Sequence, residues 1–465
     1  MHKKTIAITL GSAAAFRNLF FFPGSVFEQL RVYAKKNNIR ILVCITPKDY
    51  EKYQPIINPD GEYVCYEKIS VAPARRSLER VFYFFYSYLV YTGTTKVLAT
   101  MAIRPDEPPA GGKSYLVFLK WTISRFFGWS RFLKRNVIPF LFHKIFIERP
   151  FRDTIESYQP DLMVSTHIYG WFDTQFLREA KAQGIKTIGM PAGWDHLDKY
   201  FLPFHPDTLL VPSKELSNAA VKYQAYAKFE IQIVGYAHFD FILNPEIQKT
   251  RDEVLRFLNF PPHAKYLLYV SGSAYCPDEP DIIETLLQWF EEKQVGDEDV
   301  YLVIRPYLGG RGKDREFDEK KFNRFKTHPR VYFFDKPLWN DVENSASFIN
   351  IMRYADVVLG MYTTIVLEAS VFDRPLIAAG FDGYTTRPMK RSIRRFEYLE
   401  HFKDVLKTGA LPTAYNFSEL QELLKLTLAD PHSRSHEREK LRHSLAGVLD
   451  GASSRRIVDA LINAL

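Results

Sequence analysis

Short apolar runs that alternate with helical stretches are the feature that most limits how this sequence can fold. In the first half, such runs occupy residues 5–10, 40–45, 161–166, 186–190, 208–211 and 231–234. In the second half, they occupy residues 266–270, 301–305, 331–334, 356–359 and 375–378. Short apolar strands between helices of about 10 to 15 residues are typical of parallel sheets that helices cover on both faces. The sequence therefore predicts the α/β class, with two doubly wound, Rossmann-like domains.

The length of 465 residues also favours two domains over a single core. We expect the boundary near residues 242–262, where prolines and charges mix. This gives an N-terminal domain over residues 1–245 and a C-terminal domain over residues 246–465. The last helix, "SSRRIVDALINAL", carries an apolar stripe that must pack on another element, for which the first domain is a candidate.

The composition is that of a folded protein, with 46% hydrophobic and 25% charged residues. Cys44, Cys65 and Cys276 are far apart and odd in number, which indicates neither a disulfide framework nor a zinc site and favours a reducing compartment. The apolar run over residues 5–10 is shorter than the core of a signal peptide. No run reaches the roughly 18 to 20 apolar residues that cross a bilayer. We therefore expect a cytoplasmic protein, soluble or bound to one membrane face.

Residues 80–149 interleave aromatic and basic side chains. One interpretation is an amphipathic helix pair in the headgroup layer, with Trp121, Trp129 and the phenylalanines inserted and the cations facing anionic lipid. The other is a set of core helices with a solvated basic face. Both stay open at this point. No recognisable nucleic-acid-binding module is present, so no nucleic-acid partner is expected. The basic residues are Lys120, Arg125, Arg131, Lys134, Arg135 and Lys144.

Ligands of open parallel sheets bind beyond the carboxyl ends of the strands, so the polar residues at those ends are the candidates for a site. Glycine there permits close backbone approach, hydroxyl groups donate hydrogen bonds, and helix N-termini favour phosphate. Arg305 and Lys336 could add positive charge. The strand-end strings are "LGSAAAFRN", "STHIYGWFD", "MPAGWDHLD", "YVSGSAY", "VIRPYLGG", "FFDKP", "VLGMYTT" and "AAGFD".

Each of these strings also has a plainer interpretation. The "SGS" at residues 271–273 is a common turn string, and Arg305 could be structural. His167 is either a core histidine or a catalytic base or substrate contact. Asp195 and Asp198 lack the further ligands of a metal site, so no metal is predicted. The sequence has no "GxxxxGK[ST]", no "GxGxxG" after a strand and no "GxSxG", which argues against a kinase, a dehydrogenase and an ordinary serine hydrolase.

Four strings, taken in order, resemble those of a known superfamily. They are "GWDHLDK", "IVGYAHFDFI", "ADVVLGMYTTIVLEASVFDRPLIAAGFD" and "DGASSRRIVDAL". Together they resemble the GT-B glycosyltransferases, and most nearly the CDP-glycerol glycerophosphotransferase-like branch and its relatives in surface-polysaccharide synthesis. The resemblance covers most of residues 155–465, and the first 150 residues match only in layout. It implies a GT-B-like fold in which two Rossmann-like domains face a central cleft.

The resemblance also implies roles for particular residues. A nucleotide-diphosphate donor would bind the second domain and an acceptor the first, without a metal or other cofactor. Thr363 and Thr364 would hold the diphosphate, and Glu368 the ribose hydroxyls. His167, or Asp195 if the histidine is structural, would activate the acceptor hydroxyl. The expected donor-binding residues are Gly11, Ser271, Gly272, Ser273, Arg305, Lys336, Thr363, Thr364, Glu368 and Asp382, although Asp382 could instead cap a turn.

Departures from the branch bear on the donor. His196 stands where the branch has asparagine, and Ala237 stands where it has proline. The teichoic-acid polymerases of the branch have a Ser-Ser pair preceded by Asp, whereas here Met361 and Tyr362 precede two threonines. These changes weaken a CDP-glycerol donor and leave a sugar nucleotide. We therefore predict a glycosyltransferase acting on a cell-surface glycan or its lipid-linked precursor at the cytoplasmic membrane face. The alternatives are a CDP-polyol polyolphosphotransferase, a sugar-nucleotide epimerase, and a non-catalytic glycan- or nucleotide-binding subunit.

Overall fold

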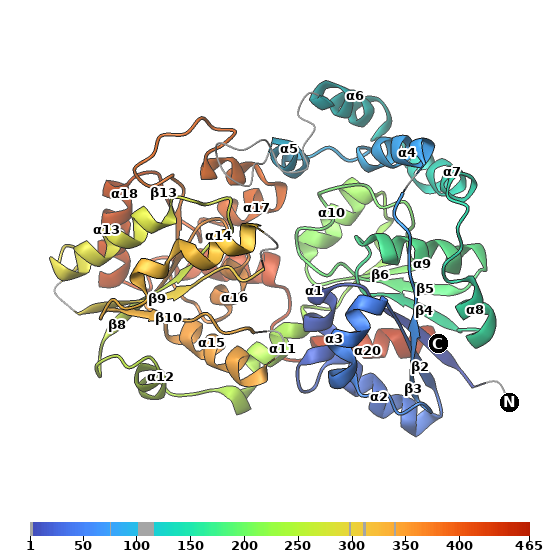
Figure 1. Cartoon of the computed structure of the whole chain (residues 1–465), viewed down its shortest axis with the longest axis horizontal. Coiled ribbons are helices and arrows are strands. Elements are labelled where there is room, and N and C mark those ends of the chain that lie inside the picture. Colours follow the sequence, from blue (N-terminus) through green and yellow to red (C-terminus); the bar gives the residue numbers. More distant parts are fainter. Residues whose placement is uncertain (1–2, 75, 101–115, 297–298, 310–312, 339–340) are drawn as a thin grey trace. The chain divides into compact units, whose positions relative to one another are not determined.

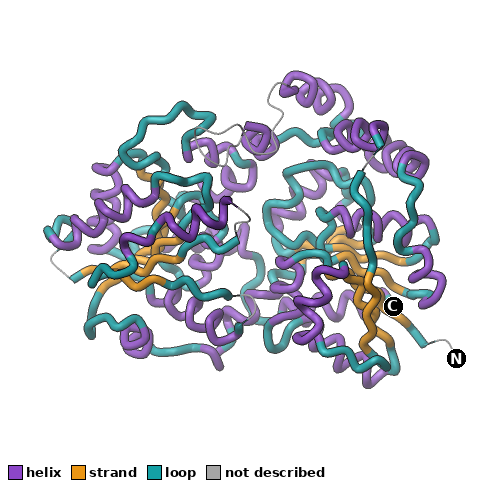
Figure 2. Tube along the Cα trace, in the orientation of Figure 1, coloured by secondary structure: helices purple, strands orange, loops and turns teal. Residues whose placement is uncertain are grey.

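The computed structural model describes residues 3–74, 76–100, 116–296, 299–309, 313–338 and 341–465. It divides into two compact units (Figure 1). Unit 1 comprises Met1–Thr92, Phe118–Leu243 and Gly447–Leu465, and unit 2 comprises Gly93–Val117 and Asn244–Ala446. Each unit contains one sheet with helices packed on both of its faces (Figure 2).

The sheet of unit 1 has seven strands in the order β3-β2-β1-β4-β5-β6-β7, and all of its pairings are parallel. All six residues of β1 are buried, as expected for a central strand covered on both faces. The order of the strands reverses between β1 and β4, which pair with Ile8 opposite Val164. The strands are β1 Thr5–Leu10, β2 Arg40–Ile45, β3 Val64–Lys68, β4 Leu162–Ser165, β5 Lys186–Gly189, β6 Thr208–Val211 and β7 Ile231–Ile233.

The helices of unit 1 follow from capping residues and apolar spacing in the sequence. In α2, for example, the Ser25 side chain caps the first turn by accepting from the Glu28 amide, and Asn38 ends the helix in the left-handed region at a φ of 54°. The helical segments are α1 Ala13–Phe16, η1 Arg17–Phe21, α2 Val26–Asn37, α3 Pro47–Ile57, α4 Ser77–Ser87, α6 Val117–Phe127, η3 Leu133–Val137, α7 Ile138–Ile145, α8 Arg152–Tyr158, α9 Trp171–Ala182, α10 Lys214–Gln224, η4 Lys228–Glu230, α11 Ala237–Leu243 and α20 Ser453–Ala464.

Unit 2 has a six-stranded parallel sheet in the order β10-β9-β8-β11-β12-β13. Its order reverses between β8 and β11, where Gly360 lies opposite Val270. The strands are β8 Lys265–Val270, β9 Val300–Arg305, β10 Val331–Phe333, β11 Val357–Gly360, β12 Leu376–Ala379 and β13 Thr413–Ala414. The helical segments are α5 Gly93–Thr100, η5 Pro245–Ile247, α12 Arg251–Phe257, α13 Glu279–Glu291, α14 Lys313–Lys321, η6 Asn323–Phe325, α15 Val342–Tyr354, α16 Ile365–Val371, η7 Ile393–Tyr398, α17 Glu400–Thr408, α18 Phe417–Ala429, α19 Ser435–Leu441 and η8 Arg442–Ala446.

Both units are Rossmann-like, so the predicted fold class is confirmed. Each of the eleven predicted strands is present, with both ends within one residue of the prediction. The structure adds β3 and β13, which the sequence analysis did not predict. No helix among the described residues is long and apolar enough to cross a membrane.

The described part of residues 80–149 is mostly helical, but its charges are not arranged as expected. Lys120 and Lys134 are buried, and Lys134 donates to the Tyr223 carbonyl at 2.9 Å. Arg135 forms an ion pair with Glu230. The expectation that all six basic side chains of this segment face outward is therefore wrong, because three of them hold unit 1 together.

The C-terminal helix α20 completes the core of unit 1. Ile457 and Leu461 are buried in one cluster with residues of α2 and of the central strands. At the start of α20, the Asp240 carboxylate accepts hydrogen bonds from the amides of Ser453 at 3.0 Å and Ser454 at 2.6 Å. A carboxylate on these amides offsets the positive end of the helix dipole. The end of "IVGYAHFD" thus caps the start of "SSRRIVDAL", although the two strings are far apart in the chain.

We expect Asp240→Ala to destabilise unit 1 by about 2 kcal/mol, because two backbone amides lose a charged acceptor. Thermal unfolding of the purified protein would show this as a melting temperature several degrees lower. Asp459→Ala is the matched control, since Asp459 is exposed on the same helix. Equal melting temperatures for the two variants would mean that Asp240 does not hold α20 in place.

Candidate functional site

The reversal point of the unit 1 sheet contains a buried polar network. Asp173, in the first turn of α9, is fully buried. Its Oδ1 accepts hydrogen bonds from the hydroxyls of Thr9 at 2.5 Å and Ser165 at 2.8 Å, and from the His167 amide at 3.2 Å. Its Oδ2 is also buried, and no described residue donates to it. One oxygen of this carboxyl is thus held by the protein, and the other is left without a partner.

Two glycines leave room beside the unpartnered oxygen. A Cβ placed on Gly11, directly after β1, would lie 3.1 Å from Asp173 Oδ2. A Cβ placed on Gly170 would lie 3.3 Å from the same oxygen and 3.2 Å from His167 Nδ1. The carboxyl oxygen and the imidazole therefore border one small space that any larger residue would fill. Gly11, predicted as a donor contact, thus lies in unit 1 beside Asp173.

Burial shifts the pKa values of the Asp173 carboxyl and the His167 imidazole in opposite directions. Burial raises the pKa of the Asp173 carboxyl to about 6, although the hydrogen bonds to Oδ1 oppose the rise. Burial, with smaller contributions from His196 and Lys199, lowers the pKa of the His167 imidazole to about 3. Both ring nitrogens of His167 lack a partner among the described residues. At neutral pH, therefore, Asp173 is a carboxylate that can accept a proton, whereas His167 is a neutral and weakly basic ring.

Asp195, the second predicted base, already has a cationic partner. Lys199 forms an ion pair with its Oδ2, and His196 Nε2 lies 3.7 Å from its Oδ1. The His196 ring lies 5.0 Å from the ring of His167 and is stacked on Tyr169. The structure thus brings both predicted catalytic residues to the same edge of the unit 1 sheet. Because Lys199 engages its carboxylate, Asp195 is less suited than Asp173 to accept a proton.

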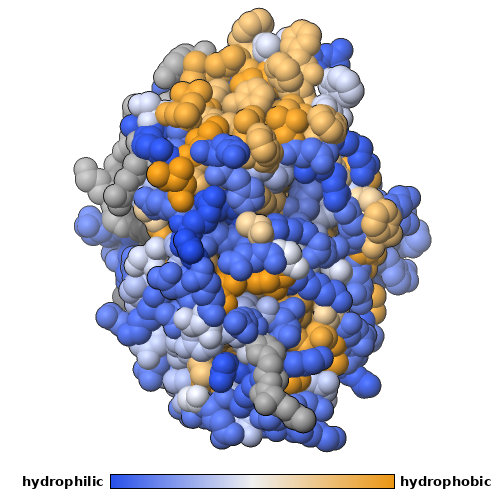
Figure 3. All heavy atoms as spheres, turned by 90° about the vertical axis from the view of Figure 1, so that its right-hand side faces the viewer, coloured by the Kyte–Doolittle hydropathy of each residue, from blue (hydrophilic) through white to orange (hydrophobic). Residues whose placement is uncertain are grey.

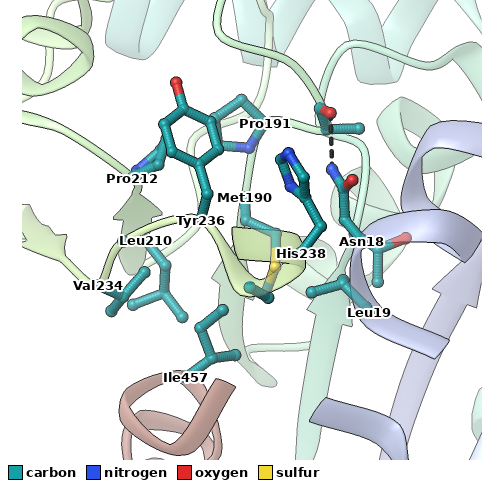
Figure 4. Close-up of a pocket in the computed structure, with 14 residues that line it drawn as sticks. Asn18, Leu19, Met190, Pro191, Leu210, Pro212, Val234, Tyr236, His238 and Ile457 are labelled. Atoms are coloured by element: carbon teal, nitrogen blue, oxygen red, sulfur yellow. Dashed lines mark hydrogen bonds between the residues drawn. The ribbon is translucent and has the colours of Figure 1, made fainter. Parts of the chain in front are cut away.

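A small cavity borders the same network. It has a volume of about 30 Å³, room for about one water molecule, and it is too small for a sugar. Met190 after β5, Leu210 of β6 and Ile457 of α20 are among the lining residues (Figure 4). Thr166, directly after β4, lines it as well. The buried His238 ring also lines it. At this size the cavity cannot by itself be the sugar-binding pocket.

Unit 2 has a comparable set of residues where β8 and β11 lie side by side. Thr363 and Thr364 follow β11, and Glu368 lies one turn further along on α16. The Thr363 hydroxyl accepts from the Ile365 amide at 3.1 Å, whereas Thr364 is exposed and Glu368 half-buried. A Cβ on Gly360 would lie 2.6 Å from the Val270 carbonyl, so only glycine fits there between the two strands.

The loop at residues 271–273 is shaped by a buried ion pair that the sequence analysis did not identify. Glu279 Oε2 lies 2.6 Å from Lys321 Nζ, and both side chains are buried. Glu279 also accepts from the Gly272 amide at 2.8 Å and from the Ser271 hydroxyl at 3.1 Å. Lys321 donates to the carbonyls of Gly272 and Ser273, each at 3.2 Å. The Gly272 amide and the Ser271 hydroxyl are therefore used to fix the loop, which leaves Ser273 as its candidate for a ligand contact.

The two predicted cations of unit 2 differ in how firmly they are held. Arg305 ends β9 and is nearly buried; its Nη1 donates to the carbonyls of Phe334 at 3.0 Å and Lys336 at 2.7 Å. Burial lowers its pKa to about 10, so it remains charged at neutral pH. The Lys336 side chain is exposed, and its ammonium lies 5.6 Å from the centre of the Phe257 ring. Arg305 is thus a fixed charge at the strand end, and Lys336 a surface charge.

Asp382 follows β12 and acts locally. Its Oδ1 accepts from the amide of Ile393, the first residue of η7, at 2.9 Å, and burial raises its pKa. Of the two roles considered for Asp382, the turn-capping role is the one with a visible contact. Whether any of the predicted donor-binding residues contacts a donor stays a prediction.

No protein-family model matches this sequence, and no curated protein is significantly similar to it. Among solved structures, the chain is similar to a putative UDP-N-acetylglucosamine 2-epimerase from Listeria monocytogenes, at 13% identity over 99% of this chain and 96% of that one, with a TM-score of 0.55. It is also similar to the Neisseria meningitidis UDP-GlcNAc 2-epimerase bound to UDP-GlcNAc, at 12% identity, 99% and 100% coverage and a TM-score of 0.52. A glycosyltransferase from Rickettsia africae follows, at 9% identity, 100% and 99% coverage and a TM-score of 0.51.

The chain has a GT-B-type fold. Identities this low establish the fold alone, and the same fold serves both epimerases and glycosyltransferases. The GT-B-like fold that the resemblance implies is therefore confirmed. The branch within it stays a prediction.

We expect Asp173→Asn to stabilise the protein at neutral pH. Because the pKa of Asp173 is higher in the folded state than in the unfolded state, protonation of Asp173 stabilises the folded state. This stabilisation is complete below pH 3.8, the pKa in the unfolded state, and is lost as the pH rises through about 6. Asparagine stays neutral throughout, and its Oδ1 can keep the same hydrogen bonds. The gain at about pH 7.5 should approach 3 kcal/mol, at about 1.4 kcal/mol per pKa unit, and vanish near pH 4.

Melting temperatures measured at both pH values check this expectation. Asp153→Asn removes an exposed carboxyl from the first turn of α8 and serves as the control, with little change at either pH. If Asp173→Asn were less stable than the wild type at pH 7.5, the burial of Asp173 would not cost the folded state free energy.

Proposed function

We propose that this chain is a GT-B-type enzyme that transfers a sugar from a nucleotide-diphosphate donor to a hydroxyl group of a cell-surface glycan or its lipid-linked precursor. The observation that carries the proposal is the buried Asp173 carboxyl at the reversal point of the unit 1 sheet. One of its oxygens is held by three donors, and the other is buried without a partner beside Gly11 and Gly170. Partly satisfied buried carboxyls with raised pKa values are typical of functional sites.

In the proposed reaction, Asp173 Oδ2 accepts the proton of the acceptor hydroxyl. The acceptor oxygen then forms a bond to the anomeric carbon of the sugar as the bond from that carbon to the diphosphate breaks, and a nucleoside diphosphate leaves. The neutral His167 ring would position the acceptor by a hydrogen bond. A pKa near 6 suits this task, because most of the carboxyl is ionised at neutral pH while its basicity exceeds that of an ordinary aspartate.

The donor would be bound by unit 2. Arg305 offers a fixed positive charge at the end of β9, and Thr364 offers an exposed hydroxyl at the start of α16. Positive charge and hydrogen-bond donors would stabilise the diphosphate as it takes up the leaving electrons. Glu368 would accept hydrogen bonds from the ribose hydroxyls. Because cations of the protein serve the leaving group in this scheme, we expect turnover to persist in the presence of EDTA.

A sugar-nucleotide epimerase is the second candidate, since two of the similar structures are UDP-GlcNAc 2-epimerases. An epimerase would interconvert a sugar nucleotide without an acceptor, whereas the transferase requires one. A thermal-shift screen of nucleotides and nucleotide sugars would identify the donor first. The products then decide the reaction: an acceptor-dependent nucleoside diphosphate supports the transferase, and an epimeric sugar nucleotide overturns it. A monophosphate released from a CDP-polyol, or binding without turnover, would indicate a polyolphosphotransferase or a binding subunit.

We expect kcat/KM of the wild type to rise with pH through about 6, as Asp173 loses its proton and becomes able to accept one. Asp173→Asn should lower kcat by roughly 10²- to 10⁴-fold and leave donor affinity unchanged. Glu179→Gln, which alters a buried carboxyl on the same helix that is bonded to the Phe151 amide, is the control. His167→Ala should raise the KM of the acceptor and keep the change near pH 6. If the change near pH 6 disappeared in His167→Ala and persisted in Asp173→Asn, the imidazole would be the base.

We expect Glu368→Ala to weaken nucleoside-diphosphate binding by about tenfold, equivalent to about 1.4 kcal/mol, through lost hydrogen bonds to the ribose. A double-mutant cycle with the 2′- and 3′-deoxynucleotides sharpens the measurement. If Glu368 binds a ribose hydroxyl, calorimetry should show that the variant discriminates little between the nucleotide and the corresponding deoxynucleotide. If the losses of affinity from the substitution and from the missing hydroxyl are additive, Glu368 does not contact the ribose.

A further inference from the structure

The outer faces of α4, α6 and α7 in unit 1 expose many apolar side chains. Of the 24 large apolar residues that are exposed in the described part of the chain, 12 lie between residues 78 and 147. Figure 3 shows apolar side chains gathered over these helices. The 12 are Leu78, Val81, Tyr83, Phe118, Leu119, Trp121, Phe126, Phe127, Trp129, Phe132, Phe140 and Ile147. We call the group formed by Phe118, Trp121, Phe126, Trp129, Phe132 and Phe140 the aromatic surface.

The helices that carry the aromatic surface are anchored on their other side. Phe142 of α7 is fully buried, and its ring lies 6.3 Å from that of Phe82, 5.8 Å from that of Tyr86 and 5.1 Å from that of Phe204. In α6, Ile123 is buried. These helices therefore fill their share of the core with one face and present a second apolar face to solvent.

The spacing of the exposed residues matches a helix lying along a surface. Residues 131–145 are helical, and Phe132, Asn136, Phe140 and Lys144 follow one another at intervals of four and are all exposed. Residues four apart in a helix lie on the same side of it. Trp129, which is 77% exposed, precedes this row by three residues. The row joins aromatic rings with a cation at its end.

The charge of this segment has a single sign. Residues 116–147 contain six Lys or Arg residues and no Asp or Glu. Lys120, Lys134 and Arg135 serve packing or internal pairing. Arg125 and Lys144 are exposed. The apolar surface is thus accompanied by cations, with no carboxylate between residues 116 and 147.

We propose that the aromatic surface docks unit 1 onto an anionic lipid membrane, from one side and without crossing it. Trp and Phe rings insert at the level of the headgroups, while Arg125 and Lys144 bind lipid phosphates. The described helices are too short or too polar to span a bilayer. A second copy of the chain is a poorer partner, because each copy would present the same positive charge. The proposal does not depend on the transferase reaction.

Flotation with vesicles of phosphatidylcholine alone, or mixed with phosphatidylglycerol, tests this surface. We expect the wild type to float with the anionic vesicles at about 50 mM NaCl, and much less at about 500 mM or with the neutral vesicles. Trp129→Ala with Phe132→Ala should lower the partition coefficient by at least about tenfold. Arg125→Gln with Lys144→Gln should lower it by about tenfold or more at low salt, and little at high salt.

Matched variants elsewhere in unit 1 separate a specific surface from general stickiness. Phe229 is 90% exposed outside the aromatic surface, and Arg455 is exposed on α20, so Phe229→Ala and Arg455→Gln should bind as the wild type does. All substituted side chains are exposed, so circular dichroism and melting temperatures should be preserved. Failure of the wild type to float at low salt would overturn the proposal, as would equal losses in the matched variants. If the wild type does not float but forms a dimer, and the double variant Trp129→Ala with Phe132→Ala is a monomer, the surface binds a second copy instead.

Discussion

In each sheet, two parallel strands pair that are not consecutive in the sequence, and this pairing sets where a ligand can bind. Where β1 pairs with β4, and where β8 pairs with β11, the strand order reverses. The connections that follow such a pair leave toward opposite faces of the sheet, so the carboxyl ends of the two strands stay uncovered by a helix. In both units the strand ends at this point carry small or hydroxyl-bearing residues. Gly11 and Gly360 show the constraint most clearly, since a side chain at either would meet a neighbouring polar group.

Each unit also buries a carboxyl in the first turn of the helix that follows one of these strands, and the two carboxyls differ in how they are paired. Glu279 of α13 has both oxygens engaged, by Lys321, two hydroxyls and a backbone amide. Asp173 of α9 has one oxygen engaged and no cation among its hydrogen-bond partners. A fully paired buried carboxylate fixes a loop, whereas a half-paired one retains basicity at a cost in folding free energy. Burial raises the pKa of Glu279 as well, but its ion pair with Lys321 and its hydrogen bonds oppose the rise.

The sequence was a good guide to the strands and a partial guide to the site. Fully buried parallel strands are continuous apolar runs, so eleven were found to within a residue; β3, "VCYEK", lies at a sheet edge with only one residue fully buried, and β13 has only two residues. His167 was a candidate because it follows the end of a strand, and its role in catalysis stays a prediction. Asp173 was missed although it stands in the quoted string "STHIYGWFD", because the room beside its free oxygen depends on Gly11, far away in the chain. Glu279 and Lys321 were missed for the same reason, since their pairing is visible only in the fold.

Unit 1 cannot be complete until the last residues of the chain are in place. Its core includes Ile457 and Leu461 of α20, and a fully buried aliphatic side chain contributes roughly 1.5–3 kcal/mol. Asp240 holds the start of this helix, and Arg456 donates to the Val234 carbonyl at 2.8 Å and pairs with Asp450. A Cβ on Gly235 would lie 2.3 Å from the Ser453 hydroxyl, so the helix approaches the backbone there. Residues 233–242 and 450–461, two of the strings on which the family resemblance rests, therefore contact each other in the fold. During synthesis, α20 is made after all of unit 2, so the core of unit 1 gains the contacts of this helix last.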